Sequence, residues 1–535
     1  MVDSEKDKDL EAEQQSENAG RLVGVIDIGS NSIRMELAEI QSDGRIELLE
    51  KVQRPVHLGQ DAFLRGKLGS DTMSAAIEIL RDYRRIINSY DVETIRTVAT
   101  SSLREAGNRD AFIDRVARTV DLDVDVIEQT EQSRLIVSAV LDDSGEVLGL
   151  RRKSAMVAEV GGGGTLITIL RRGEIAATQS YILGSVRMLE MLAISQEQPE
   201  RAADLVRKHI MSTVEMAKSS LRLRSIGTFV AIGGDARFAA QQVGENITGS
   251  ELVSVSSSAL DSLVAECVRY TPEELSAKYG LPYADAEPLV PALLVYQALL
   301  EATRAEAMIV SQVSMRDGLL LDIPRYITGK DAPELIEGIL HSAKSIGYKY
   351  RFDGKHAEQV AELSLRIFDE MEKEHGLSSR DRLLLNVAAL LHDIGMYVSN
   401  KAHHKHSGYL ISNAEIIGLR RADVAVVAQV SRYHRKTVPK LSHPEYVAMP
   451  RDRRMLINKL AAILRVADAL DRGHWQQVRD FTFERKDREL TLYVKGAADL
   501  ALERRALEEK ADLFEDMFGL KVRLEEDAGQ SAPIS

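Results

Sequence analysis

The sequence predicts an α/β protein with two duplicated domains, followed by an all-α domain and a small α+β module. A pattern of strand, small-residue turn and strand occurs twice, at Val23–Arg34 and Met156–Leu170. Strands alternate with helical stretches from residue 21 to about residue 325, and beyond Ala332 long helices with one apolar stripe follow. The paired hairpins indicate that the two α/β domains are duplicated halves that flank a cleft.

These patterns divide the chain into five segments. We expect a disordered acidic tail at 1–20, α/β domain I at 21–140, α/β domain II at 141–325, a helical domain at 332–475 and a small α+β module at 476–535. The tail holds seven acids, two lysines and almost no apolar residue, which is the composition of a chain that cannot bury a core.

Apolar periodicity predicts the helices within these segments. In domain I they cover Met73–Ser89 and Arg109–Arg118, and a strand at Asp125–Ile127 leads into a helix that begins near Thr130. In the helical domain they cover His356–Met371, Arg382–Leu391 and Met455–Leu470. The last module alternates as a hairpin at Phe481–Phe483 and Leu490–Val494, followed by a helix near Ala498–Met517, a stop at Gly519 and a strand at Lys521–Leu524.

The composition is that of a globular cytoplasmic protein. Hydrophobic residues make up 44% and charged residues 28% of the 535 positions, and no apolar run has the length of a membrane span. The single cysteine, Cys267, excludes an intramolecular disulfide and a cysteine-based metal cluster. Its apolar neighbours Leu263, Val264 and Val268 predict a buried helical thiol.

The charge is acidic overall but basic in one stretch. A formal net charge of −13 argues against a nucleic-acid binder. Met396–Lys459, however, holds 12 Lys and Arg against four Asp and Glu. A solvated basic face and a surface that guides an anion both explain this stretch.

The two hairpins carry the residue types of a phosphate cradle. The glycines of their turns permit positive φ and a close backbone approach to an anion; they are Gly29, Gly161, Gly162, Gly163 and Gly164. Asp27 and Glu159 are carboxylates suited to a hard divalent cation. Additional side-chain donors are Ser30, Asn31, Ser32 and Thr165. A tight turn between core strands is the simpler interpretation of one such hairpin, but two copies with matching carboxylates favour a phosphate site.

On these residues the chain resembles the exopolyphosphatase / guanosine pentaphosphate phosphohydrolase (Ppx/GppA) family. Thr97–Asn108 is similar to the family's A-T-S-A-L-R-x-A-x-N, and Thr130–Ile136 to its G-x-E-E-A-R-L-I. Further matching stretches are Leu183–Arg187, Ala231–Ala236 and Ser314–Leu319. The resemblance implies an actin-like fold of the ASKHA, ribonuclease H-like type for the α/β domains, and an HD-type fold for the helical domain.

The resemblance also implies roles for single residues. Glu131 is expected to be the general base that activates water, and Arg34 and Arg104 are expected to bind phosphate. A glutamate in the first turn of a helix and an arginine in a surface ion pair are the alternatives. The chain departs from the family pattern at four positions: Glu159 replaces an aspartate, Gln132 and Leu166 replace acids, and Gly164 replaces a phosphate-binding serine. Binding is therefore better supported than turnover.

A second set of residues resembles the metal site of HD-type phosphohydrolases. It consists of His356, His392, Asp393, His434 and Asp468, with His403, His404 and His406 between them in the sequence. Imidazoles and carboxylates suit a divalent transition metal that activates water. For His392 and Asp393 alone, a hydrogen bond at a helix end is the simpler interpretation.

We therefore expect an exopolyphosphatase that releases terminal orthophosphate from inorganic polyphosphate, with Mg²⁺ or Mn²⁺ in the cleft. The alternatives are guanosine pentaphosphate hydrolysis, and a polyphosphate or nucleotide sensor with metal-dependent chemistry in the HD-type domain. We also expect a homodimer without a nucleic-acid or membrane partner. Arg432, Arg435 and Lys436 are expected to form a track for long polyphosphate.

Overall fold

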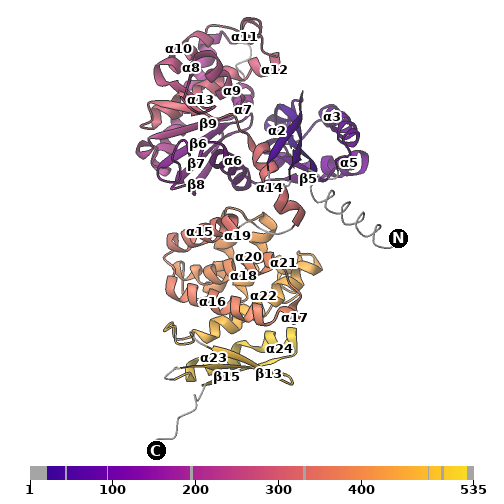
Figure 1. The fold of residues 1–535 in the computed structure, drawn as a ribbon, viewed down its shortest axis with the longest axis vertical. Helices are drawn as coiled ribbons and strands as arrows, with labels where there is room; N and C mark the ends of the chain where they lie inside the picture. Colours follow the sequence, from indigo (N-terminus) through magenta and orange to yellow (C-terminus); the bar gives the residue numbers. More distant parts are fainter. Residues whose placement is uncertain are drawn as a thin grey trace, which may run out of the picture. The chain divides into compact units, whose positions relative to one another are not determined.

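In the computed structural model the chain forms two compact units, one up to Thr328 and one from Gly329 (Figure 1). The structure describes residues 21–41, 45–92, 94–192, 197–328, 333–479, 481–495 and 499–526. The predicted acidic tail at 1–20 lies outside the described residues. Each unit is described by itself.

The first sheet of the first unit has five strands in the order β3-β2-β1-β4-β5. Its strands are β1 (Arg21–Ile28), β2 (Ser32–Ile40), β3 (Ile46–Pro55), β4 (Thr94–Ala99) and β5 (Val124–Val126). The associated helices are α2 (Leu58–Arg65), α3 (Ser70–Ser89), α4 (Ser101–Glu105), α5 (Arg109–Val120) and α6 (Gln129–Ser144). The first predicted hairpin is thus β1 and β2, in whose register Asp27 lies opposite Arg34.

The second sheet has seven strands in the order β10-β11-β12-β9-β6-β7-β8. They are β6 (Ser154–Val160), β7 (Thr165–Arg171), β8 (Glu174–Tyr181), β9 (Thr228–Ile232), β10 (Glu245–Asn246), β11 (Val253–Ser256) and β12 (Ala307–Val310). Its helices are α7 (Ser185–Leu192), α8 (Pro199–Ser220), α9 (Gly234–Val243), α10 (Ser257–Cys267), α11 (Pro272–Tyr279), α12 (Tyr283–Ala286), α13 (Leu289–Ala302) and α14 (Met315–Thr328). The second predicted hairpin is β6 and β7, in whose register Glu159 lies opposite Leu166.

The two sheets have one topology in common. The order β3-β2-β1-β4-β5 corresponds to β8-β7-β6-β9-β12, with antiparallel pairs on the hairpin side and parallel pairs on the other. Helices α6 and α14 pack together and bring Ile136 and Ile323 into a core that also holds Val98 of the first sheet and Val230 of the second. This duplication places the two hairpin turns at equivalent ends of their sheets.

The second unit is helical and carries one small sheet. The helices are α15 (Pro333–Lys349), α16 (Gly354–Glu370), α17 (Glu372–His375), α18 (Ser379–Leu391), α19 (His403–Ser412), α20 (Arg421–Arg432), α21 (Pro444–Val447) and α22 (Arg451–Leu470). A sheet in the order β13-β14-β15 follows, from β13 (Phe481–Lys486), β14 (Glu489–Val494) and β15 (Lys521–Glu526), with α23 (Ala501–Lys510) and α24 (Asp512–Phe518). One core joins these parts, because Leu464, Leu492 and Phe514 belong to the same buried cluster.

Local sequence signals account for several boundaries. Ser378 and Asp381 form a capping box at the start of α18. Gly519 ends α24 in the left-handed region with φ 68°, as predicted. The single helix predicted near Ala498–Met517 is instead two helices, α23 and α24. Cys267 is buried on α10 as predicted, and burial raises its pKa to about 11. Among the described residues no helix is long and apolar enough to cross a membrane.

Candidate functional sites

A polar cavity of about 180 Å³ lies in the first unit, where the turns of the two hairpins meet. Both hairpins contribute to its lining, with Asp27, Ser30, Arg34, Glu159, Gly161, Gly162, Gly163 and Gly164. The other lining residues that matter below are Arg104, Gln132, Arg187, Arg237 and Arg316. The structure therefore brings the predicted phosphate hairpins to one cavity.

The predicted reason for the glycines is wrong in one respect. Neither Gly29 nor any of the glycines at 161–164 has a positive φ. Close packing requires a glycine instead at Gly163, where a Cβ would lie 2.4 Å from Oγ of Ser101. At Gly162 a Cβ would lie 3.2 Å from Cβ of Ser30, which is a tight contact between the two turns. The Gly29 and Gly161 N–H groups also close their own turns, by donating to the carbonyls of Ser32 and Gly164.

The four predicted side-chain donors differ in their positions. Ser30 lines the cavity and forms a hydrogen bond with Ser101 over 3.0 Å between their Oγ atoms. Thr165 is fully buried and donates to the carbonyl of Leu183, and Asn31 donates to the carbonyl of Ala284. Ser32 is buried as well. Ser30 is thus the predicted hydroxyl donor that faces the cavity, while Thr165 and Asn31 hold the turns in place.

The two predicted metal-binding carboxylates of the hairpins meet in the cavity. Oδ2 of Asp27 lies 3.4 Å from Nη1 of Arg316, whereas the buried Oδ1 has no hydrogen-bond partner among the described residues. Glu159 accepts a hydrogen bond from Nε2 of Gln132 at 2.9 Å. Burial raises the pKa of Glu159; the Gln132 bond opposes this, and the negative charge of Asp27 adds to it. Two carboxylates that line one cavity, one of them with a buried oxygen that lacks a hydrogen-bond partner among the described residues, fit a divalent cation.

Five arginines give the cavity a positive wall. The guanidinium of Arg104 donates to the carbonyl of Ile127, and that of Arg187 donates to the carbonyl of Gly163 and pairs with Glu105. Arg316 is held by Asp27 and Glu36. Arg237, which follows the Ala231–Ala236 motif, has a buried Nη1 without a hydrogen-bond partner among the described residues. Burial and the nearby Arg34 lower its pKa. Sequence reasoning gave no role to Arg187, Arg237 or Arg316, although each lies in or beside a matching motif.

Glu131 lies outside the lining of this cavity. It is 8% exposed in the first turn of α6, and both of its carboxylate oxygens accept hydrogen bonds from Arg134 at 2.9 Å. Arg134 and Arg96 also pair with Asp322, and Arg96 lies 3.6 Å from Glu131. The neighbouring Gln132 lines the cavity instead. Glu131 is thus part of a buried ion-pair network behind the cavity.

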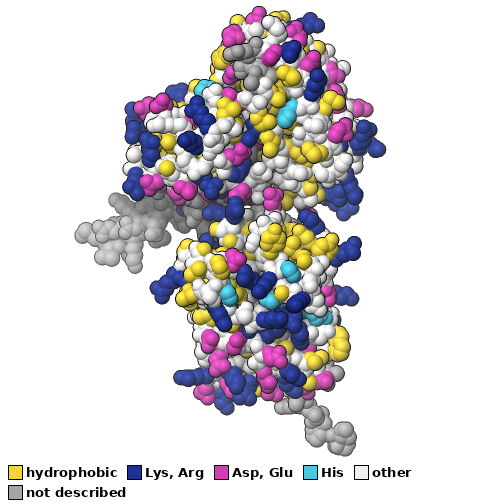
Figure 2. Space-filling model, turned by 180° about the vertical axis from the view of Figure 1, so that it is seen from behind, with side chains coloured by type: hydrophobic (Ala, Val, Ile, Leu, Met, Phe, Trp, Pro, Cys, Tyr) yellow, Lys and Arg dark blue, Asp and Glu magenta, His cyan; other side chains and the backbone are white. Residues whose placement is uncertain are grey.

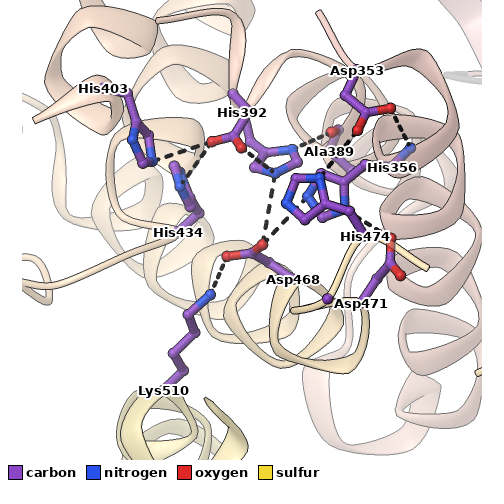
Figure 3. A network of polar contacts seen from close by, with 12 residues as sticks. Asp353, His356, Ala389, His392, His403, His434, Asp468, Asp471, His474 and Lys510 are labelled. Carbon is purple, nitrogen blue, oxygen red and sulfur yellow. Dashed lines mark hydrogen bonds and ion pairs between the residues drawn. The ribbon is translucent and has the colours of Figure 1, made fainter. Parts of the chain in front are cut away.

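The second unit holds a cluster of histidines and aspartates that includes all five predicted HD-type ligands, four of which are labelled in Figure 3. Nε2 of His356 lies 3.6 Å and Nε2 of His392 lies 3.8 Å from Oδ1 of Asp468. Nε2 of His434 lies 3.4 Å from Oδ1 of Asp393. The helices α16, α18, α20 and α22 therefore bring together residues that are up to 112 positions apart in the sequence.

Sequence reasoning did not single out His403 for this cluster. Its Nε2 lies 3.3 Å from Oδ1 of Asp393, and with Asp393 and His434 it forms a group that could hold a metal ion. His404 and His406, which follow it on α19, belong to no such group among the described residues. The sequence pattern does not distinguish His403, His404 and His406 from one another. The structure identifies His403, the first residue of α19, as the one that faces Asp393.

The imidazoles are oriented as metal ligands. In each of four rings Nδ1 bonds to an acceptor outside the centre: Ala389 for His392, Ser431 for His434, Asn400 for His403 and Asp471 for His356. Such bonds place the proton on Nδ1 and leave the Nε2 lone pair facing the carboxylates. Nε2 of His356 and of His392 and Oδ1 of Asp393 are buried without hydrogen-bond partners among the described residues. Acceptors that face one another in this way fit a metal ion.

The pKa values of the residues in this cluster are shifted in different directions. Burial lowers the pKa of His434 to about 3, so its ring is neutral. Burial also disfavours a charged His356, but the nearby carboxylates of Asp468 and Asp471 prevail and raise its pKa to about 9. The pKa of Asp468 is held well below its usual range, since Lys510 and the histidines outweigh burial.

The predicted track residues lie on the surface of the same unit. Arg432 pairs with Glu445 at 3.1 Å, and Lys436 is exposed just after α20. Lys436 and Arg435 contribute, after burial and His403, to a pKa of about 4 for His404. Figure 2 shows Lys and Arg side chains gathered beside histidines on one face of this unit. A positive surface therefore exists next to the histidine cluster.

Comparison with known proteins gives the same family along both units. Residues 37–326 match the model of the Ppx/GppA phosphatase family, and residues 340–516 match that of Ppx/GppA phosphatase, domain III. A guanosine-5'-triphosphate,3'-diphosphate pyrophosphatase of Aliivibrio fischeri is 26% identical over 506 residues, which are 93% of this chain and 97% of that protein. A protein of the same name from Photobacterium profundum is 24% identical over 448 residues, 83% of this chain and 86% of that protein.

A solved structure shows the same fold. An exopolyphosphatase from Cytophaga hutchinsonii ATCC 33406 superposes with a TM-score of 0.52 and 21% identity, and the match covers 57% of this chain and 97% of that one. The actin-like fold with mixed sheets is thereby confirmed.

Proposed function

The chain belongs to the Ppx/GppA phosphatase family, whose members hydrolyse phosphoanhydrides, and on this premise we propose that it releases terminal orthophosphate from inorganic polyphosphate. The observation that carries the proposal is the meeting of Asp27 and Glu159, from equivalent positions of two hairpins, in one arginine-lined cavity. Such a cavity provides what phosphoryl transfer needs, namely neutralised charge and a positioned phosphorus.

In the proposed site Asp27 and Glu159 hold Mg²⁺ or Mn²⁺, which neutralises charge on the phosphate oxygens when bound. Arg34, Arg104 and Arg237 bind the phosphate chain, and the glycine turns line the cavity that receives it. Ser30 adds a hydroxyl donor at the first turn. These assignments extend the sequence predictions by Arg237.

We propose Glu159 in place of Glu131 as the residue that accepts the proton of the attacking water. Glu159 faces the cavity, and Nε2 of Gln132 holds its carboxylate there by a hydrogen bond of 2.9 Å. Glu131 would first have to leave Arg134, which holds both of its carboxylate oxygens. Gln132, which faces the cavity beside Glu159, is an amide and cannot act as a base.

Guanosine pentaphosphate is the alternative substrate, because the curated relatives that match most of this chain carry that kind of name. Phosphate release from long-chain polyphosphate and from guanosine pentaphosphate should be measured side by side, each over a Mg²⁺ titration. We expect the wild type to prefer polyphosphate, and Asp27→Ala to flatten the Mg²⁺ dependence while the chain remains folded. If Asp27→Ala shows the same Mg²⁺ dependence as the wild type, Asp27 is not a ligand of the metal. If the wild type releases phosphate from guanosine pentaphosphate but not from polyphosphate, guanosine pentaphosphate is the substrate.

A second candidate function rests on the histidine–aspartate cluster. We propose that this cluster is an HD-type centre that binds a divalent transition metal through His356, His392, Asp393, His403, His434 and Asp468. Two observations support this. The Nε2 atoms of His356 and His392 are buried without hydrogen-bond partners among the described residues, and the ligand atoms of the cluster lie close enough together to hold a metal ion. When bound, such a metal supplies an activated water for phosphate ester or anhydride hydrolysis. If His392→Ala loses metal while polyphosphate hydrolysis persists, the centre serves another substrate or the structure alone.

A further inference from the structure

A lysine of the C-terminal module reaches into the histidine–aspartate cluster. Nζ of Lys510, the last residue of α23, forms an ion pair with Oδ2 of Asp468, and Figure 3 shows the side chain reaching Asp468 from the helix at the bottom of the view. Lys510 is only 7% exposed. A buried ammonium must be paired to be stable, so this contact is built into the fold.

The position of Lys510 is fixed by a second buried cation. Arg465, one turn before Asp468 on α22, is 1% exposed and donates from Nε to the backbone carbonyl of Lys510 at 2.9 Å. Its Nη2 pairs with Asp512 at 2.7 Å, at the start of α24. The chain is therefore held against α22 at Lys510 and at Asp512, which fixes the backbone from which the ammonium extends.

The two carboxylates at the centre of the cluster consequently differ. Oδ2 of Asp468 is already occupied by the ammonium, and its Oδ1 faces His356 and His392. Oδ1 of Asp393 faces Nε2 of His403 and Nε2 of His434 and has no hydrogen-bond partner among the described residues. The buried ammonium therefore lies on the Asp468 side of the centre.

Charge balance limits how many divalent ions such a site accepts. Asp393 and Asp468 supply two negative charges to the centre, and Lys510 offsets one of them. One divalent ion brings the centre near neutrality, whereas two ions beside a buried ammonium would leave several positive charges uncompensated in a low-dielectric environment.

We propose that Lys510 stands in for a second metal ion, so that the cluster binds one divalent ion, on the Asp393–His403–His434 side, and that removal of the lysine charge opens Asp468 to a second ion. Imidazole and carboxylate ligands favour Mn²⁺, Fe²⁺, Co²⁺ or Zn²⁺. The inference rests on the proposed metal centre and goes beyond it by assigning the number of ions and the residue that sets this number.

The test uses the full chain, freed of metal, equilibrated with Mn²⁺ and passed over a desalting column. Bound Mn²⁺ per chain is measured by mass spectrometry, and electron paramagnetic resonance distinguishes an isolated ion from a coupled pair. Cavity-bound Mn²⁺ is removed from the count by subtracting the value for His392→Ala/Asp393→Ala. We expect one ion for the wild type and for Lys510→Arg, and two coupled ions for Lys510→Met. Lys521→Met, an exposed lysine of the same module, is the matched control.

The possible outcomes distinguish failure of the role proposed for Lys510 from failure of the metal centre itself. Two coupled ions in the wild type, or one ion in Lys510→Met, would overturn the role of Lys510 and leave the metal centre intact. No cluster-bound ion in the wild type would overturn the centre itself. Should Lys510→Met fail to fold, Lys510→Gln keeps a polar group at the same place and is measured in its stead.

Discussion

Gln132 donates a hydrogen bond to Glu159 across the cavity, 2.9 Å from Nε2 to Oε2, while the preceding residue, Glu131, turns away toward Arg134. One step along α6 thus separates a residue of the cavity from a residue of the buried ion-pair network. The amide fixes the carboxylate of Glu159 in place without competing with it for a proton.

Glu159→Gln should lower phosphate release about 10²–10⁴-fold, the usual contribution of a general base, with polyphosphate binding reduced only in the presence of Mg²⁺. Glu131→Gln should instead lower the free energy of unfolding, because the loss of one partner of a buried ion pair costs roughly 3–5 kcal/mol. Single-turnover phosphate release and denaturant unfolding of both variants measure the two effects. Loss of turnover in Glu131→Gln at unchanged stability would restore Glu131 as the base.

Substitutions that return acidic and hydroxyl groups to the cavity should differ in outcome. Gly164→Ser should reduce activity, with or without Leu166→Glu, because a Cβ at position 164 would lie 2.8 Å from the carbonyl oxygen of Tyr181. Gln132→Glu meets no such obstacle and should raise kcat, since it adds a carboxylate that faces the cavity. If kcat falls instead, the hydrogen bond to Glu159 matters more than an added base.

Asp235 gives a pH-dependent prediction of stability. Burial, followed by the negative charge of Asp285, raises its pKa to about 7 in the folded chain, against the positive charges of Arg34 and Arg237. An acid whose folded pKa exceeds its unfolded pKa of about 4 destabilises the fold as pH rises between these values. Asp235→Asn should therefore raise the free energy of unfolding fully above pH 7, partly between pH 4 and 7, and not below pH 4. A gain that is the same at pH 4 and pH 8 would show that the Asp235 charge is not its cause.

The basic surface of the second unit should affect long substrates more than short ones. Neutralising Arg432, Arg435 and Lys436 together should raise KM for long-chain polyphosphate and leave tripolyphosphate unchanged, because a short substrate is held by the cavity alone. Salt should abolish the difference, since exposed charges are screened over about 8–10 Å at physiological ionic strength. The same change of charge at the exposed Lys486, Arg488 and Lys495 is the control. An equal change in KM for both substrates would show that these three residues do not form a track for long polyphosphate.

The sequence could predict what depends on local pattern. Both hairpins, the left-handed stop at Gly519 and the convergence of five HD-type ligands follow from short motifs and apolar periodicity. The buried network around Glu131 could not be predicted as a whole, because Arg134 is only three positions away but its other members, Arg96 and Asp322, lie 35 and 191 positions from Glu131 in the chain. The sequence could not show why the hairpin turns contain glycines, because a positive φ and close packing both favour glycine. The structure shows close packing and no positive φ at these glycines.

The shared core of the second unit has a consequence for how the chain can be divided. Because Lys510 contacts Asp468 and Leu492 packs in the same buried cluster as Leu464, the small sheet and its two helices are not a removable appendage. A truncation after α22 would expose apolar surface and strip the histidine centre of its internal cation at once. The C-terminal module therefore cannot be replaced by that of a homologue through a junction after α22. A fragment meant to isolate the helical domain must extend through β15.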